Sequence, residues 1–140
     1  MDMCTRLCQA QRIPDREPHT FIKVLTNIWF RPFGAPKVLE HDEEGAFTSA
    51  LVTKWLSDVQ VTLVLKPKNT HTWMVERHHD ILRQLYVRIR YQAQEEGIQY
   101  DDDDILAMAV MAKNCMITVG QYSPQTAVFG TTWHPPGPGS

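Results

Sequence analysis

Segments with strand character alternate with segments of helical spacing along this chain, and this alternation is the strongest constraint on its fold. We predict strands at about Thr5–Ile13, Lys37–His41 and Val59–Leu65. A helical pattern separates each strand from the next, and three more helical segments follow the last strand. Strands joined by helical crossovers pair in parallel, so the sequence predicts an α/β sheet of about three strands with helices on both faces.

The helical segments are recognised by apolar residues three and four positions apart. The longest is expected at about Trp73–Glu95, with a stripe of Val75, Leu82 and Tyr86 packed against the sheet. The apolar spacing after residue 104 is also helical, so we expect no strand in Asp104–Val119. The chain after residue 124 predicts one more short helix.

Four consecutive acids, Asp101 to Asp104, come directly before a helical pattern. We interpret them as residues that cap the helix rather than as a metal cluster, because a helix N-terminus carries unpaired N–H groups and partial positive charge. Neighbouring side chains on a helix also point in different directions and do not converge on one ion. For the same reason we expect one of His78 and His79 to pack and the other to be exposed.

Composition predicts one ordinary globular domain. The chain has 140 residues, of which 43% are hydrophobic, and its net charge of −2 does not favour a nucleic-acid binder. We therefore expect one domain at residues 1–130 and a Pro/Gly-rich tail at residues 131–140. No apolar run approaches the roughly 20 residues of a membrane span, and the first residues lack the apolar core of a signal peptide, so we expect an intracellular protein.

The cysteines do not indicate a metal site. Cys4, Cys8 and Cys115 are an odd number and form no Cys-x-x-Cys pair. A zinc site would need two more ligands beside Cys4 and Cys8, so reduced thiols are the favoured interpretation.

Two carboxylates lie at a spacing that carries more information. Asp42 ends a predicted strand, Phe47 follows five residues on, and Val75-Glu76-Arg77 opens the longest helix with Glu76 34 positions after Asp42. This pattern resembles the second and third acids of the retroviral and retrotransposon integrase catalytic core, which has a ribonuclease-H-like fold.

The resemblance covers about Leu7–Gly130. Ala112-Lys113-Asn114 and the segment from residue 120 to Gly130 are similar to the last part of some retrotransposon integrase cores. Integrase cores begin with three antiparallel strands, and on this alignment our first predicted strand is the third of them. The first catalytic Asp of the family then has no counterpart here. The expected fold is therefore an incomplete, diverged ribonuclease-H-like domain.

The resemblance implies a particular chemistry for the two acids. Integrase sites use three carboxylates to hold two divalent ions, which clamp the attacking and leaving oxygens of a phosphoryl transfer. Asp42 and Glu76 are the ancestral catalytic and metal-binding residues on this reading, and two acids alone would hold at most one ion weakly. We expect no cofactor, and the alternative is Mg²⁺ or Mn²⁺. If the alignment holds, the two carboxylates should lie close enough to share an ion or a water molecule.

Two functions follow from the resemblance. In the first, the chain is an integrase-derived, non-catalytic structural or interaction subunit of a larger protein assembly. Its neighbours would be proteins, bound through the Leu7–Ile13 strand edge and the Trp133–Pro138 tail. In the alternative, the chain is a retrotransposon integrase-type core, or a fragment of one, that binds DNA and joins strands in the nucleus.

Overall fold

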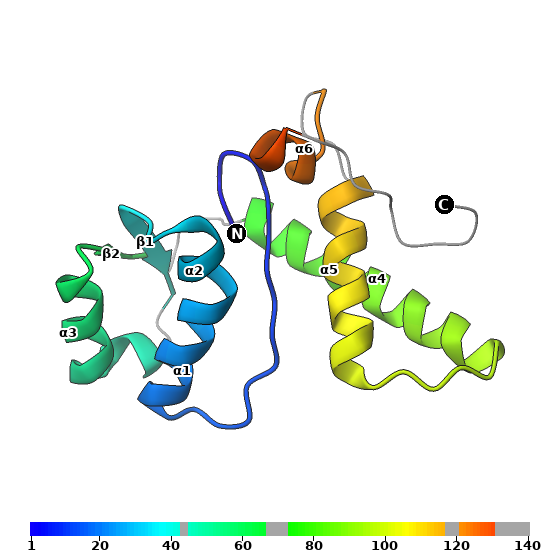
Figure 1. The fold of residues 1–140 in the computed structure, drawn as a ribbon, viewed down its shortest axis with the longest axis horizontal. Coiled ribbons are helices and arrows are strands. Elements are labelled where there is room, and N and C mark those ends of the chain that lie inside the picture. The colour runs from blue at the N-terminus through cyan, green and yellow to red at the C-terminus, as the bar shows by residue number, and fades with distance from the viewer. Residues whose placement is uncertain (43–44, 67–72, 117–120, 131–140) are drawn as a thin grey trace. The chain divides into compact units, whose positions relative to one another are not determined.

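The chain forms two compact units. The computed structural model describes residues 1–42, 45–66, 73–116 and 121–130. One unit contains residues Gln11–His71, and the other contains Met1–Ala10 together with Thr72–Ser140. Figure 1 shows the course of the chain, and the position of one unit relative to the other is not determined.

The Gln11–His71 unit begins with a helix that ends in a bend. Helix α1 (Pro18–Leu25) has proline at its first position, where the missing N–H costs nothing. A π-helical turn (Thr26–Phe30) and the short α2 (Arg31–Phe33) continue it. Gly34 then ends the helical segment with a φ of 86°, a conformation that glycine adopts without strain.

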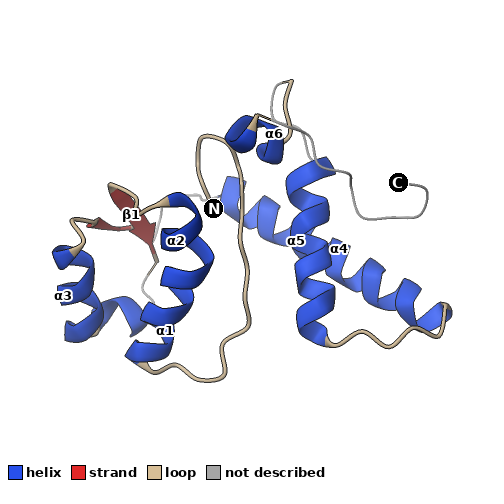
Figure 2. Cartoon of the chain, in the orientation of Figure 1, coloured by secondary structure: helices blue, strands red, loops and turns tan. Residues whose placement is uncertain are grey.

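A two-stranded parallel sheet follows in the same unit. Strands β1 (Val38–His41) and β2 (Thr62–Leu65) pair in register, with Val38 opposite Thr62 and His41 opposite Leu65. A 3₁₀ turn (Gly45–Thr48) and α3 (Ala50–Asp58) form the crossover between them. Figure 2 shows the strands and the helices of the unit. The sequence-based prediction of these two strands and of their parallel pairing is confirmed.

The core of this unit lies between α1, α3 and the sheet. Val52 and Leu56 of α3 are fully buried, and Val61 completes the buried cluster at the start of β2. Aromatic rings close the cluster: those of Phe30 and Trp55 stack with their centroids 5.0 Å apart. The helical spacing in α3 predicts inward-facing side chains at Leu51, Val52, Trp55 and Leu56; the last three pack in the core, whereas Leu51 is 40% exposed and its predicted burial is wrong.

The other unit consists of helices and the N-terminal segment. Helix α4 (Trp73–Glu95) packs against α5 (Asp102–Met116), and α6 (Pro124–Phe129) packs against α5 in turn. The carboxylate of Asp101 accepts a 2.8 Å hydrogen bond from the backbone N–H of Asp104, so the predicted capping at the start of α5 is confirmed. The part of Asp104–Val119 that the structure describes, up to residue 116, is helical, as predicted.

The predicted strand at Thr5–Ile13 is wrong. The chain there is a turn followed by an irregular segment, and the turn is closed by a 2.8 Å hydrogen bond from the Asp2 N–H to the Leu7 carbonyl. A strand needs a neighbouring strand to bond its backbone groups. Here the N–H and C=O of Cys8 instead bond the side chain of Asn114 on α5. A side chain thus takes the place of the expected strand partner.

The predicted fold class is confirmed, in a smaller form. Two strands rather than about three are present in the residues that the structure describes. The packing of the long helix against the sheet concerns both units and stays a prediction, as does the division at residue 130. The Trp133–Pro138 tail lies outside the described residues. None of the described helices is long and apolar enough to cross a membrane.

Candidate carboxylate site

Asp42 directly follows β1, and local contacts fix the backbone at this point. Its side chain is exposed to solvent. The Nδ1 atom of the preceding His41 lies 2.6 Å from the Asp42 carbonyl oxygen. A carbonyl can only accept, so Nδ1 carries the proton and donates it to this bond. The end of the strand is therefore held by its own last side chain.

Phe47 links the end of this strand to the core. Its ring stacks on the imidazole of His41 with centroids 4.4 Å apart, and it meets the ring of Phe21 on α1 edge-on at 4.9 Å. The aromatic residue five positions after Asp42 is thus a packing residue. It connects the 3₁₀ turn Gly45–Thr48 both to the end of β1 and to α1.

Glu76 lies in the first turn of α4 with its side chain exposed. A carboxylate at this position is stabilised by the partial positive charge of the helix N-terminus. Two residues on, His78 is buried, whereas His79 is exposed, so the expected division between the two histidines is confirmed. Burial lowers the pKa of His78, and the charge of Lys113 lowers it further.

The structure places the two acids in different units. Asp42 belongs to the Gln11–His71 unit and Glu76 to the unit that contains α4, so their proximity stays a prediction. In the described residues, His, Cys, Asp and Glu side chains form no group of three or more that could hold a metal ion. Two carboxylates are the kind of oxygen ligand that Mg²⁺ prefers, and they fit one ion in chemical type. Cys4, Cys8 and Cys115 are free thiols.

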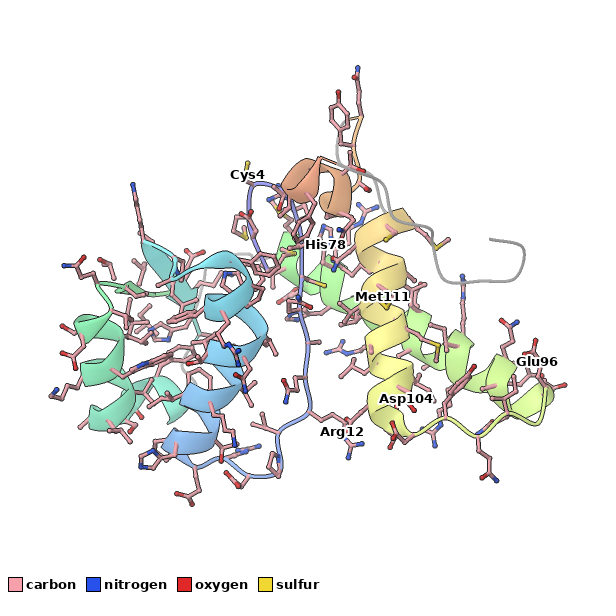
Figure 3. The ribbon with its side chains drawn as sticks, in the orientation of Figure 1. Cys4, Arg12, His78, Glu96, Asp104 and Met111 are labelled. Atoms are coloured by element: carbon pink, nitrogen blue, oxygen red, sulfur yellow. The ribbon has the colours of Figure 1, made fainter. Side chains whose placement is uncertain are left out.

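Sequence reasoning missed a set of buried polar residues in the helical unit. Lys113 and Asn114 lie inside the otherwise apolar buried face of α5, and Gln125 is buried on α6. A Lys-Asn pair that interrupts an apolar helical stripe is the signal that could have found them. Figure 3 shows His78, the buried histidine of α4. The sequence did predict the burial of one of the two histidines in this helix.

Two solved structures with a similar fold are integrase catalytic cores. The catalytic core domain of BIV integrase superimposes with a TM-score of 0.71 and 16% identity, over 89% of this chain and 78% of that one. The HTLV-2 integrase catalytic core domain in complex with magnesium gives a TM-score of 0.63 and 14% identity, over 80% of this chain and 70% of that one. The chain therefore has the fold of the retroviral integrase catalytic core.

The sequence comparison leads to a retroelement. The chain is 28% identical over 106 residues to the Retrovirus-related Pol polyprotein from transposon 297 of Drosophila melanogaster. That match covers 76% of this chain but only 10% of the polyprotein, so the chain spans about a tenth of this relative. No protein-family model matches. The chain is thus an integrase-like domain that is similar to part of a retroelement Pol polyprotein.

Proposed function

We propose that these 140 residues act as a non-catalytic, integrase-derived interaction domain within a larger protein assembly. The observation that carries the proposal is the exposed apolar side of the sheet. Val38 is 58% exposed and Val64 is 40% exposed, and the pairing register places both on the face opposite to the one whose Leu39 and Leu63 pack on the core. Parallel sheets are normally covered on both faces. A protein neighbour that covers these side chains would supply the missing layer.

The free edge of β1 supports the same proposal. The carbonyls of Lys37 and His41 accept hydrogen bonds from the N–H groups of Thr62 in β2 and of Lys66 just after it, at 2.9 and 2.8 Å. Residues along a strand in a parallel ladder direct their backbone groups alternately to one edge and to the other. Val38 and Glu40 of β1 therefore direct theirs to the edge away from β2. No other described strand pairs with that edge. Unpaired strand edges bind further strands readily, so a partner can extend this sheet.

The two segments expected to contact neighbours have separate outcomes. In the Leu7–Ile13 segment, Leu7 is buried and cannot contact a partner. Ile13 is exposed, and its apolar side chain remains available to one. The segment would act as an irregular chain and not as a strand edge. A role for the Trp133–Pro138 tail remains part of the proposal.

Analytical ultracentrifugation of the purified chain tests the interaction role. We expect species heavier than the 16.1 kDa monomer, because exposed apolar strands associate. Replacing Val38 and Val64 together by lysine should restore the monomer. Val87→Lys on α4 is the matched control, since it changes an equally exposed valine away from the sheet. A wild-type chain that stays monomeric, with its termini freely cleaved by protease, would contradict the proposal.

The alternative function is that of an integrase-type DNA strand-transfer core. Its specific support is that Asp42 and Glu76 are both exposed and lie at a strand end and a helix start, respectively. Under this alternative Asp42 and Glu76 would hold Mg²⁺ or Mn²⁺, and the protein would act on DNA in the nucleus. We favour the first proposal because a two-ion site uses more carboxylates than these two.

Calorimetric titration with Mg²⁺ or Mn²⁺ and a strand-transfer assay separate the two functions. The first proposal expects no turnover from the purified chain. Asp42→Asn is the informative variant, and Asp58→Asn is its control, because Asp58 is an exposed acid whose partner is Lys54. Metal-dependent joining or cleavage of DNA that Asp42→Asn abolishes and Asp58→Asn preserves would establish the alternative.

A further inference from the structure

Three buried nitrogen atoms in the helical unit have no hydrogen-bond partner among the described residues. They are Nζ of Lys113, Nδ1 of His78 and Nε2 of Gln125, and each exposes less than 1 Å². The three residues are 1%, 8% and 3% exposed, respectively. Buried polar groups are nearly always hydrogen-bonded, and a buried ammonium without a partner is among the costliest. Three such donors in one small unit therefore require an explanation.

The three residues come from helices that pack on one another. His78 lies on α4, Lys113 on α5 and Gln125 on α6, and α5 packs against both of the other helices. The helical unit thus contains three buried side-chain nitrogen atoms without a hydrogen-bond partner among the described residues.

No buried carboxylate of the described part of the chain accompanies these nitrogen atoms. Among the described residues, the buried polar side chains include Lys113 and His78 but no Asp or Glu. The neighbouring acid Asp80 is paired with Arg83 at 2.8 Å. Asp2, in the N-terminal turn, accepts hydrogen bonds from the Cys4 N–H and the Thr5 hydroxyl, both at 2.9 Å. These two carboxylates are therefore engaged within their own local structures.

We propose that Lys113, His78 and Gln125 form a binding site for a small monovalent anion, such as a halide or formate. All three atoms can donate, and a buried ammonium gains most from a negatively charged acceptor. The ligand must be small, because the three nitrogen atoms are closed off from solvent. A nucleic-acid phosphate or a side chain of a partner is too large to reach them without opening the helices. The site lies outside the Asp42 and Glu76 positions and is independent of the proposed function.

Thermal unfolding at constant ionic strength tests the site with chloride as the probe. Sodium gluconate, whose anion is too bulky for a closed site, is replaced stepwise by sodium chloride. The unfolding midpoint of the wild type should rise, and chloride at ten times its Kd should lower the unfolding equilibrium constant about elevenfold. A midpoint that does not change with chloride would overturn the proposal.

Lys113→Met identifies the amine as the binding group. The variant should be more stable than the wild type in gluconate, because an unpaired buried charge is removed, and its midpoint should not respond to chloride. Lys54→Met is the matched control, since Lys54 is an exposed lysine paired with Asp58 and should leave the chloride response unchanged. An equal chloride response in Lys113→Met and the wild type would assign the effect to general salt action and overturn the site.

Gln125→Leu provides the second variant. It removes one neutral donor and keeps the ammonium, so the chloride response should become weaker without disappearing. A full wild-type response in this variant would remove Gln125 from the site.

Discussion

The side chain of Asn114 should be among the most important polar groups for the stability of the helical unit. Its Oδ1 accepts a 3.0 Å hydrogen bond from the Cys8 N–H, and its Nδ2 donates a 2.9 Å bond to the Cys8 carbonyl. Asn114 and Cys8 are both buried. This one amide therefore satisfies two buried backbone groups that lie 106 positions away in sequence.

Replacing Asn114 by leucine keeps a similar volume but leaves both Cys8 groups unpaired. Each buried group left without a partner costs about 1–3 kcal/mol, so the free energy of unfolding should fall by about 2–5 kcal/mol after some relaxation. With a urea dependence of about 1–3 kcal/mol per molar, the midpoint should fall by roughly 1–3 M. Urea titration followed by far-ultraviolet circular dichroism measures this shift.

Asn27→Leu is the control for this prediction. Asn27 is exposed and accepts only a long 3.5 Å hydrogen bond from Arg31, so its replacement should change the free energy of unfolding by less than about 0.5 kcal/mol. If Asn114→Leu were as mild as Asn27→Leu, the paired hydrogen bonds would not hold the N-terminal segment. The account of why that segment is not a strand would then be refuted.

Three further predictions concern local features. Ser123→Ala should destabilise α6 by about 1 kcal/mol, because the Ser123 hydroxyl accepts a hydrogen bond from the Thr126 N–H; an unchanged urea midpoint would contradict this cap. Leu56→Ala in the buried cluster should cost about 2–5 kcal/mol, whereas Leu51→Ala on the exposed side of α3 should cost far less, and equal losses would refute the assigned core. Burial and the charge of Lys113 lower the pKa of His78 in the folded state, so the unfolded state binds more protons. The free energy of unfolding should therefore be highest above pH 6.5, about the ordinary pKa of an imidazole, and should fall as the pH drops below that value. In His78→Gln the urea midpoint should depend less on pH between about pH 7.5 and 5. The same pH dependence in the variant and the wild type would contradict the role of His78.

Local signals were sufficient for most of the elements. Proline and glycine have intrinsic preferences for particular backbone dihedral angles. The start of α1 at Pro18 and the end of α2 at Gly34 could therefore be predicted from the sequence. The apolar run before Lys66 likewise predicted β2. These features depend on few distant contacts.

The remaining features depend on residues that are far apart in sequence. The pattern at Thr5–Ile13 suits a strand, yet Asn114 takes the backbone bonds of Cys8. No local pattern encodes that pairing. The same holds for the burial of Lys113, because an isolated lysine in a helix is normally assigned to the surface. For the candidate site, the sequence located Asp42 and Glu76 at their element ends, whereas their separation depends on how the two units are placed.

The contact between Phe47 and His41 changes how the integrase motif should be interpreted. Five residues after Asp42, the aromatic ring of Phe47 packs on both His41 at the strand end and Phe21 on α1. This contact is one of packing, and it acts whether or not the carboxylate binds an ion. A domain of this kind can therefore lose its catalysis and still keep the five-residue interval, because the stability of the core depends on that packing.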